Sequence, residues 1–207
     1  MRAQNNRWIL TAVAAVLAGC SATIIQPDQV GDPAPVYVLD HGRHNSLVLV
    51  VDEGDVQRLA FGEWGWYVDH ETGFGRSLSA LLVDTPGALG RGRLSGPVDP
   101  DCWVDQVGSE IRNVLVFSAE QERVTTLAAE IDAEFADTEP HYSHLLNLEF
   151  VLDAREYSLG HNSNHRVVEW LEALGFEVRG NPTIGILRAA DPERSHTVDP
   201  ARCSEHP

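Results

Sequence analysis

The chain contains no lysine, so all 15 of its basic residues are arginines. They stand against 31 aspartates and glutamates, which gives a formal net charge of −16 at pH 7. A chain this acidic repels polyanions, because a phosphate-rich partner has to be neutralised by basic side chains. The charge therefore argues against nucleic acid as a partner and against electrostatic docking on anionic lipid.

Long apolar runs are equally scarce, and the one of note lies at residues 8–18 ("WILTAVAAVLA"). It follows Arg2 and Arg7 and is too short to span a bilayer comfortably, a combination typical of a secretory signal peptide. The rest of the chain has no second long apolar run, no internal repeat and no low-complexity tract. We therefore expect a single exported domain with a sizeable core.

The apolar run ends in residues 17–20 ("LAGC"), which resemble the lipobox of bacterial lipoproteins. The resemblance implies removal of residues 1–19 and attachment of acyl chains such as palmitate to Cys20, which becomes the new N-terminus. Because Ser21 rather than aspartate follows the cysteine, it also implies an outer-membrane location facing the periplasm in a Gram-negative cell. An ordinary secretory signal without lipid is the alternative.

Residues 20–35 are rich in proline, aspartate and glycine, which disfavour regular structure. We expect this segment to be a tether between the lipid and the domain. Residues 36–207 would then form the single domain, ending in a polar C-terminal tail.

Cysteine is rare, with three residues in the whole chain. If Cys20 is lipidated, Cys102 and Cys203 remain, and an oxidising compartment lets them pair. Such a disulfide would hold the polar tail against the middle of the domain. Two free thiols are the alternative.

Strand and helix patterns alternate irregularly along the domain. Strands are predicted at residues 36–40, 46–52 and 112–117, with a closing pair at 176–180 and 183–189. A short helix is expected within residues 53–62, before an aromatic strand at 63–68. Residues 84–109 are expected to form a loop, and residues 140–160 are expected to be mostly irregular. Ser118 and Gln121 resemble a capping box for a long helix at residues 119–135. The mixture predicts an α+β fold, with an antiparallel sheet packed against a few helices.

A polar stretch leads directly into an amphipathic helix at residues 157–175 ("YSLGHNSNHRVVEWLEALG"). Apolar residues recur at helical spacing over 164–174, and Gly175 follows where a helix C-terminus favours glycine. Ser163 stands at the start of this helix. It can act as the helix cap, since serine is among the best N-cap residues, or as a nucleophile.

Three motifs occur in order: "DHGRHNSLVLV" at 40–50, "EWGWYVD" at 63–69 and "EYSLGHNSNHRVVEWLEALGF" at 156–176. Together they resemble a family of uncharacterised bacterial proteins in the circularly permuted papain-like superfamily, distantly similar to NlpC-type cell-wall peptidases. The resemblance implies a permuted papain-like fold in which His44 is the catalytic base. Ser163 stands where the family has its cysteine nucleophile.

Other residues of the expected site follow from the same resemblance. Glu63 is the best candidate to orient His44, with Asn45 and His70 as weaker ones. Asn162, Asn164 and Trp66 are expected to contact a substrate.

The replacement of cysteine by serine changes the expected chemistry. A helix N-terminus and a nearby imidazolium can ionise a thiol, but a hydroxyl is far less acidic and needs a general base during attack. The expected function is therefore a membrane-anchored binding or scaffold module, or a degenerate hydrolase. The alternative is an active hydrolase or acyl transferase that uses Ser163 and His44 on amide or ester bonds of cell-wall peptides.

Histidine spacing suggests a second alternative, a metal site. Three close pairs occur, and none of them matches an HExxH helix. The pairs are His41 with His44, His141 with His144, and His161 with His165. No cofactor is expected from the sequence. The expected partners are the membrane, through the lipid, and peptidoglycan or another envelope component, with the protein itself a monomer.

Overall fold

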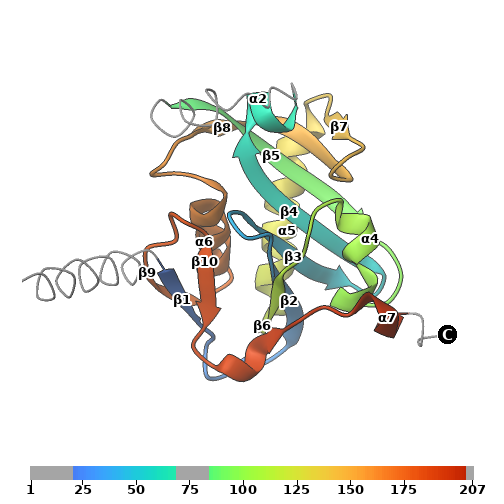
Figure 1. Ribbon diagram of the computed structural model, residues 1–207, viewed down its shortest axis with the longest axis vertical. Helices are drawn as coiled ribbons and strands as arrows, with labels where there is room; N and C mark the ends of the chain where they lie inside the picture. Colours follow the sequence, from blue (N-terminus) through green and yellow to red (C-terminus); the bar gives the residue numbers. More distant parts are fainter. Residues whose placement is uncertain (1–20, 69–83, 204–207) are drawn as a thin grey trace, which may run out of the picture.

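The computed structural model describes residues 21–68 and 84–203. Within them the fold is α+β, as the sequence pattern predicted (Figure 1). The strands are β1 (Ser21–Ile25), β2 (Pro33–Asp40), β3 (Asn45–Asp52), β4 (Asp55–Glu63), β5 (Thr85–Leu94), β6 (Asn113–Glu120), β7 (His141–Ser143), β8 (Leu148–Tyr157), β9 (Glu177–Gly180), β10 (Ile186–Ala189) and β11 (Ser195–His196). The helices are α2 (Trp64–Tyr67), α4 (Val104–Val107), α5 (Gln121–Ala136), α6 (Ser163–Ala173) and α7 (Pro200–Cys203), with the 3-10 turns η1 (Pro100–Cys102) and η2 (Pro192–Arg194).

An antiparallel sheet of eight strands forms the body of the domain, in the order β11-β6-β2-β3-β4-β5-β8-β7. Strands β2 to β5 follow one another as a meander, and β6 returns to lie beside β2. A separate sheet of three strands has the order β10-β1-β9. Among residues 21–68 and 84–203, no helix combines the length and apolar character that a membrane crossing requires.

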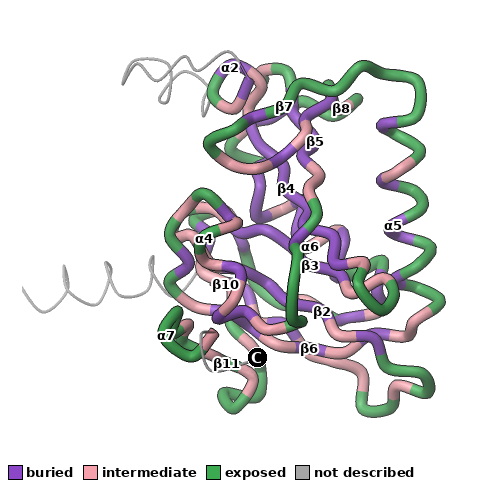
Figure 2. Tube along the Cα trace, turned by 90° about the vertical axis from the view of Figure 1, so that its right-hand side faces the viewer, coloured by how far each residue is buried: buried purple, intermediate pink, exposed green. Residues whose placement is uncertain are grey.

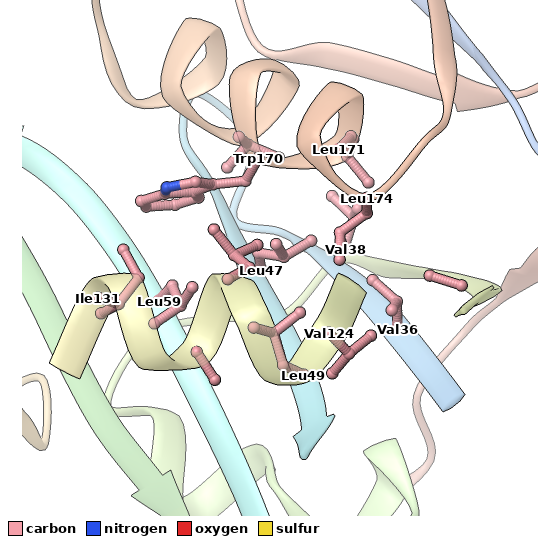
Figure 3. Packing of buried hydrophobic residues seen from close by; sticks show 14 of the residues in the cluster. Val36, Val38, Leu47, Leu49, Leu59, Val124, Ile131, Trp170, Leu171 and Leu174 are labelled. Atoms are coloured by element: carbon pink, nitrogen blue, oxygen red, sulfur yellow. The ribbon is translucent and has the colours of Figure 1, made fainter. Parts of the chain in front are cut away.

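Helices α5 and α6 pack on one face of the large sheet, over β3 and its neighbours (Figure 1). Apolar residues of α5 recur every three or four positions, so they share one side of the helix while the other side is exposed (Figure 2). Figure 3 shows Trp170 and Leu171 of α6 packed toward Val38 and Leu47 of the sheet. Burial of this cluster is the main force that holds the two helices in place.

A second buried cluster lies around Trp103, which is fully buried between η1 and α4. The ring of Tyr37 on β2 meets its edge, with 5.0 Å between ring centroids. Cys102 and Cys203 form the predicted disulfide beside this cluster, with 4.9 Å between their Cα atoms. The bond ties α7 at the end of the chain to η1.

Asp101 also holds this C-terminal tail in place. One oxygen of its buried carboxylate accepts hydrogen bonds from His196 Nε2 and from the backbone N–H of Asp199, both at 2.8 Å. Arg202 adds its charge at 3.6 Å from the other oxygen. Burial disfavours the charged form, but these hydrogen bonds and charges outweigh it and lower the pKa of Asp101 below its usual value.

We expect Asp101→Asn to lower the free energy of unfolding by about 1–2 kcal/mol at pH 7, because charge-assisted hydrogen bonds to a buried carboxylate are lost. Since the folded pKa is depressed, the contribution of Asp101 is complete above its unfolded pKa of about 4 and is lost as pH falls through the folded value. Urea unfolding of both proteins between pH 7 and pH 2.5 measures this. The difference should shrink only at the acid end; a constant difference would contradict the assignment.

Residues 55–63 form strand β4, so the predicted order of a short helix followed by a strand at 63–68 is wrong. The strand ends at Glu63, where the single turn α2 begins. Two polar residues that suggested a helix are buried and bonded instead: Gln57 donates to an aspartate of α5, and Arg58 donates to two backbone carbonyls. A strand can carry such residues in a core when their polar atoms find partners.

Strand β5 occupies residues 85–94, within the predicted loop at 84–109. Its glycines allow close packing rather than irregular backbone. A Cβ on Gly90 would lie 2.6 Å from a ring carbon of Phe150 on β8, so no larger residue fits beneath that ring. Strand β8 itself runs for ten residues through the region expected to be mostly irregular.

Helix α5 is confirmed, but its predicted capping box is wrong. Ser118 belongs to β6, and Glu120 precedes the helix without a side-chain cap. The Glu120 carboxylate instead accepts hydrogen bonds from the backbone N–H groups of Gly31 and Asp32, at 2.6 and 3.1 Å. It thereby holds the segment that joins β1 to β2.

The segment expected to be a tether begins with a strand. Ala22 and Ile24 of β1 are fully buried, and β1 lies between β9, which runs antiparallel to it, and β10, which runs parallel. The prediction that β9 and β10 pair with each other is therefore wrong, because β1 separates them. The alternating burial along β1 places its two apolar side chains against the core.

Candidate functional site

Helix α6 begins at Ser163, but Asn162 is its cap. The Asn162 Oδ1 atom accepts hydrogen bonds from the backbone N–H groups of Asn164 (3.0 Å) and His165 (3.4 Å), and His165 Nδ1 accepts from the Asn162 N–H in return. Of the two roles considered for Ser163, the helix cap is therefore excluded. Because its neighbour satisfies the helix end, the Ser163 hydroxyl is left for another partner.

That partner is His44. The Ser163 Oγ atom lies 3.0 Å from His44 Nδ1, although 119 positions separate the two residues in sequence. His44 closes the turn between β2 and β3, where its carbonyl accepts from the His41 N–H at 2.9 Å. The structure thus brings together the two residues that the sequence assigned as base and nucleophile.

A group of amide hydrogen bonds holds the two segments in register. The Asn45 Nδ2 atom donates to Asn164 Oδ1 and to the carbonyl of Gly185, both at 2.9 Å. In return, Asn164 Nδ2 donates to the carbonyl of Arg43 at 3.0 Å. These bonds clamp the start of β3 onto the start of α6, so the distance between Ser163 and His44 is set by buried groups on both sides.

Gly185, in the loop before β10, completes the clamp. Its φ of +85° lies in the left-handed region, and a Cβ there would be 2.7 Å from the carbonyl oxygen of Arg43. Only glycine allows this loop to approach the site so closely.

Burial determines the electrostatics of the pair. The His44 ring is half-buried, and this desolvation, together with the positive charge of Arg43, lowers the pKa of His44. The imidazole is therefore neutral near pH 7 and able to accept a proton. Ser163 has only 1% of its surface exposed, so a substrate carbonyl cannot reach Oγ without movement of the surrounding residues.

Where the structure describes them, the residues that were expected to orient His44 or to bind substrate do not contact the Ser163–His44 pair in these roles. The Glu63 carboxylate accepts from the Trp66 N–H at 2.6 Å and caps α2. Among the residues that the structure describes, neither Glu63 nor any other side chain makes a second hydrogen bond to the His44 ring. Trp66 is 42% exposed on α2. His70 lies outside the described residues.

Asn162 and Asn164 are buried and have their amide groups bonded to protein atoms; Asn162 Nδ2 donates to the carbonyl of Thr183 at 3.0 Å. Their expected role in substrate binding is therefore replaced by a structural one. Asn45, a weaker candidate to orient His44, likewise bonds Asn164 and Gly185 instead. The sequence placed all three near the site but could not show which groups their amides would meet.

One buried network beside the site was not anticipated. His41 Nδ1 lies 2.8 Å from the carbonyl of Glu110, and His41 Nε2 lies 2.9 Å from Ser46 Oγ, which also accepts from Arg58 Nε. Burial and the charge of Arg58 lower the pKa of His41 to about 4. The neutral ring then donates from Nδ1 and accepts from Ser46 at Nε2. The spacing of His41 and His44 was the only sequence signal, and it suggested a metal instead.

The histidine pairs do not converge. His161 faces Glu169 at 3.1 Å, whereas His165 bonds Asn162. Within residues 21–68 and 84–203, no group of three or more histidine, cysteine, aspartate or glutamate side chains is placed to hold a metal ion. The alternative of a histidine metal centre therefore finds no donor set in this part of the chain.

Two surface hollows among the described residues lie away from the site, since neither is lined by Ser163 or His44. One lies over β5 and β8, and the other lies between α5 and the end of α6. Cys20, the expected lipidation site, falls outside the described residues. In comparisons with known proteins, no family model, curated protein or solved structure matches this chain.

Proposed function

We propose that this chain is a lipid-anchored protein of the cell envelope whose papain-like site has become a catalytically silent binding module. The observation that carries the proposal is the state of Ser163: its hydroxyl is buried and bonded to a neutral His44. In a cysteine enzyme a helix N-terminus and an adjacent imidazole can stabilise a thiolate. A hydroxyl cannot be ionised by them, and a serine nucleophile needs an oriented base and an accessible oxygen.

The proposed ligand is an envelope component such as a peptide of peptidoglycan. The signal sequence and Cys20 support an envelope location on the periplasmic face, and the charge of −16 disfavours polyanions. The protein would act as a monomer that binds without turnover.

A second candidate is a serine hydrolase or acyl transferase, favoured by the 3.0 Å contact itself. In this reaction His44 Nδ1 takes the hydroxyl proton while Ser163 Oγ bonds to the carbonyl carbon of an amide or ester. The departing amine or alcohol receives that proton, and water later hydrolyses the acyl-serine. This route requires Oγ to become exposed when substrate binds.

An acyl-type serine probe separates the two functions. We expect wild-type protein and Ser163→Ala to be labelled equally, because the hydroxyl is not activated. The thiol of Ser163→Cys, in contrast, should have a pKa about one unit below that of the Ser163→Cys/His44→Ala double variant, as read from the pH dependence of its reaction with iodoacetamide. Mass spectrometry of the modified peptide measures both reactions.

Labelling of the wild type that disappears in both Ser163→Ala and His44→Ala would establish the hydrolase instead. Equal thiol pKa values in the single and double cysteine variants would show that His44 does not activate position 163. That result would remove the papain-like interpretation of the site.

A further inference from the structure

Strand β1 starts at Ser21, the residue directly after the proposed lipid attachment at Cys20, and it is the middle strand of the small sheet. Its backbone is held from the first residue: the carbonyl of Ser21 accepts from the Asn181 N–H at 3.1 Å. Consecutive Cα atoms are only about 3.8 Å apart. An acyl group on Cys20 would therefore be attached one residue before the folded sheet begins.

The end of the small sheet that contains Ser21 lies close to the candidate site. Ser21 pairs with Ile186 of β10, and the preceding Gly185 accepts from Asn45 and packs against the carbonyl of Arg43. One strand spacing, one Cα step and this contact together place Ser21 at most about 15 Å from Arg43.

The outward face of the small sheet carries exposed arginines, although the chain as a whole is acidic. Strand pairing places Arg179 and Arg188 on either side of Thr23, on the side opposite the buried Ala22 and Ile24. Both arginines are exposed. Glu177 pairs with Arg179, whereas among the described residues no acidic side chain forms an ion pair with Arg188.

The loop 181–185 adds an apolar residue to this surface, since Ile184 is 40% exposed beside the start of β1. Arginine and isoleucine together suit the boundary between headgroups and acyl chains, where a side chain can contact phosphate and hydrocarbon at once.

We infer that the anchored domain lies on the bilayer with the outer face of the β10-β1-β9 sheet and the loop 181–185 against the headgroups, which turns the Ser163–His44 site toward the membrane. This inference rests on the proposed lipid anchor. The surface that docks is a neutral, zwitterionic bilayer, because the net charge of the chain opposes an anionic one. A ligand that reaches His44 in the anchored protein then approaches from the membrane side of the domain.

Depth-dependent fluorescence quenching tests the orientation. Full-length lipidated protein carrying one added cysteine is labelled with an environment-sensitive dye and placed in phosphatidylcholine vesicles that contain a nitroxide lipid. The labelled positions are Ile184→Cys in the docking loop, Arg43→Cys beside the site, and Leu145→Cys as control. Leu145 is 69% exposed in the turn after β7, which lies far from β1 (Figure 1).

We expect quenching at positions 184 and 43 to exceed that at 145 at least threefold, and the three positions to become equal in the Cys20→Ala background. Equal quenching in acylated, vesicle-bound protein would overturn the orientation while leaving the anchor intact. Protein that lacks the acyl mass and stays out of the vesicles would overturn the anchor, and with it this inference.

Discussion

Cys20→Ala is expected to transfer the protein from the detergent phase to the aqueous phase in a two-phase separation. Buried acyl chains contribute about 0.8 kcal/mol per methylene group, a hydrophobic contribution that salt does not screen. Wild-type protein should therefore stay with membranes in high salt, and the variant should leave them.

The fold gives this experiment a clean control. Strand β1 begins after Cys20, and its pairing with β9 and β10 uses backbone groups, so the variant should keep its melting temperature. Ser21→Ala changes the adjacent residue, keeps the cysteine and should remain in the detergent phase. A Cys20→Ala protein that still fractionates with membranes would refute the lipoprotein interpretation.

The second large effect is expected from the disulfide. The double variant Cys102→Ala/Cys203→Ala should lose about 4 kcal/mol of the free energy of unfolding, because the bond joins residues 101 positions apart and restricts the unfolded chain. For a domain of this size, that loss corresponds to a fall in melting temperature of roughly 10 °C. Urea and thermal unfolding under non-reducing conditions measure it.

Wild-type protein treated with a reductant provides the matched comparison and should reach the same stability as the double variant. The tail would then be held without a covalent link, by the pairing of β11 with β6 and by Asp101 with its three partners. A loss below about 1 kcal/mol would mean that the bond constrains little in the unfolded chain.

Several elements could be predicted because their signal is local. The periodic apolar residues of α5 and α6 predicted both helices, and alternating β-branched residues predicted β2, β3 and β6. Gly175 follows α6 with a φ of +94°, as its position predicted. In each case the pattern lies within one segment, and burial of that segment's own apolar side determines the structure.

The elements that were predicted wrongly are those whose structure depends on contacts with residues far away in the sequence. Arg58 can lie in strand β4 because backbone carbonyls of two other segments accept its hydrogen bonds. Gly90 can lie in strand β5 because the ring of Phe150 packs directly against it. Local sequence shows a charged residue or a glycine in each case, which favours a helix surface or a loop. Their partners exist only after the sheet has formed.

For the candidate site, the sequence alone determined which residues are available: a serine where the family it resembles has cysteine, a histidine after an early strand, and asparagines at the starts of β3 and α6. Only the tertiary structure decided that Asn162 caps α6, that Ser163 Oγ consequently meets His44 at 3.0 Å, and that Glu63 caps α2. The reason is geometric, because a hydrogen bond depends on positions within a few tenths of an ångström. Those positions are set by the Asn45–Asn164 clamp and by the core that holds β3 against α6.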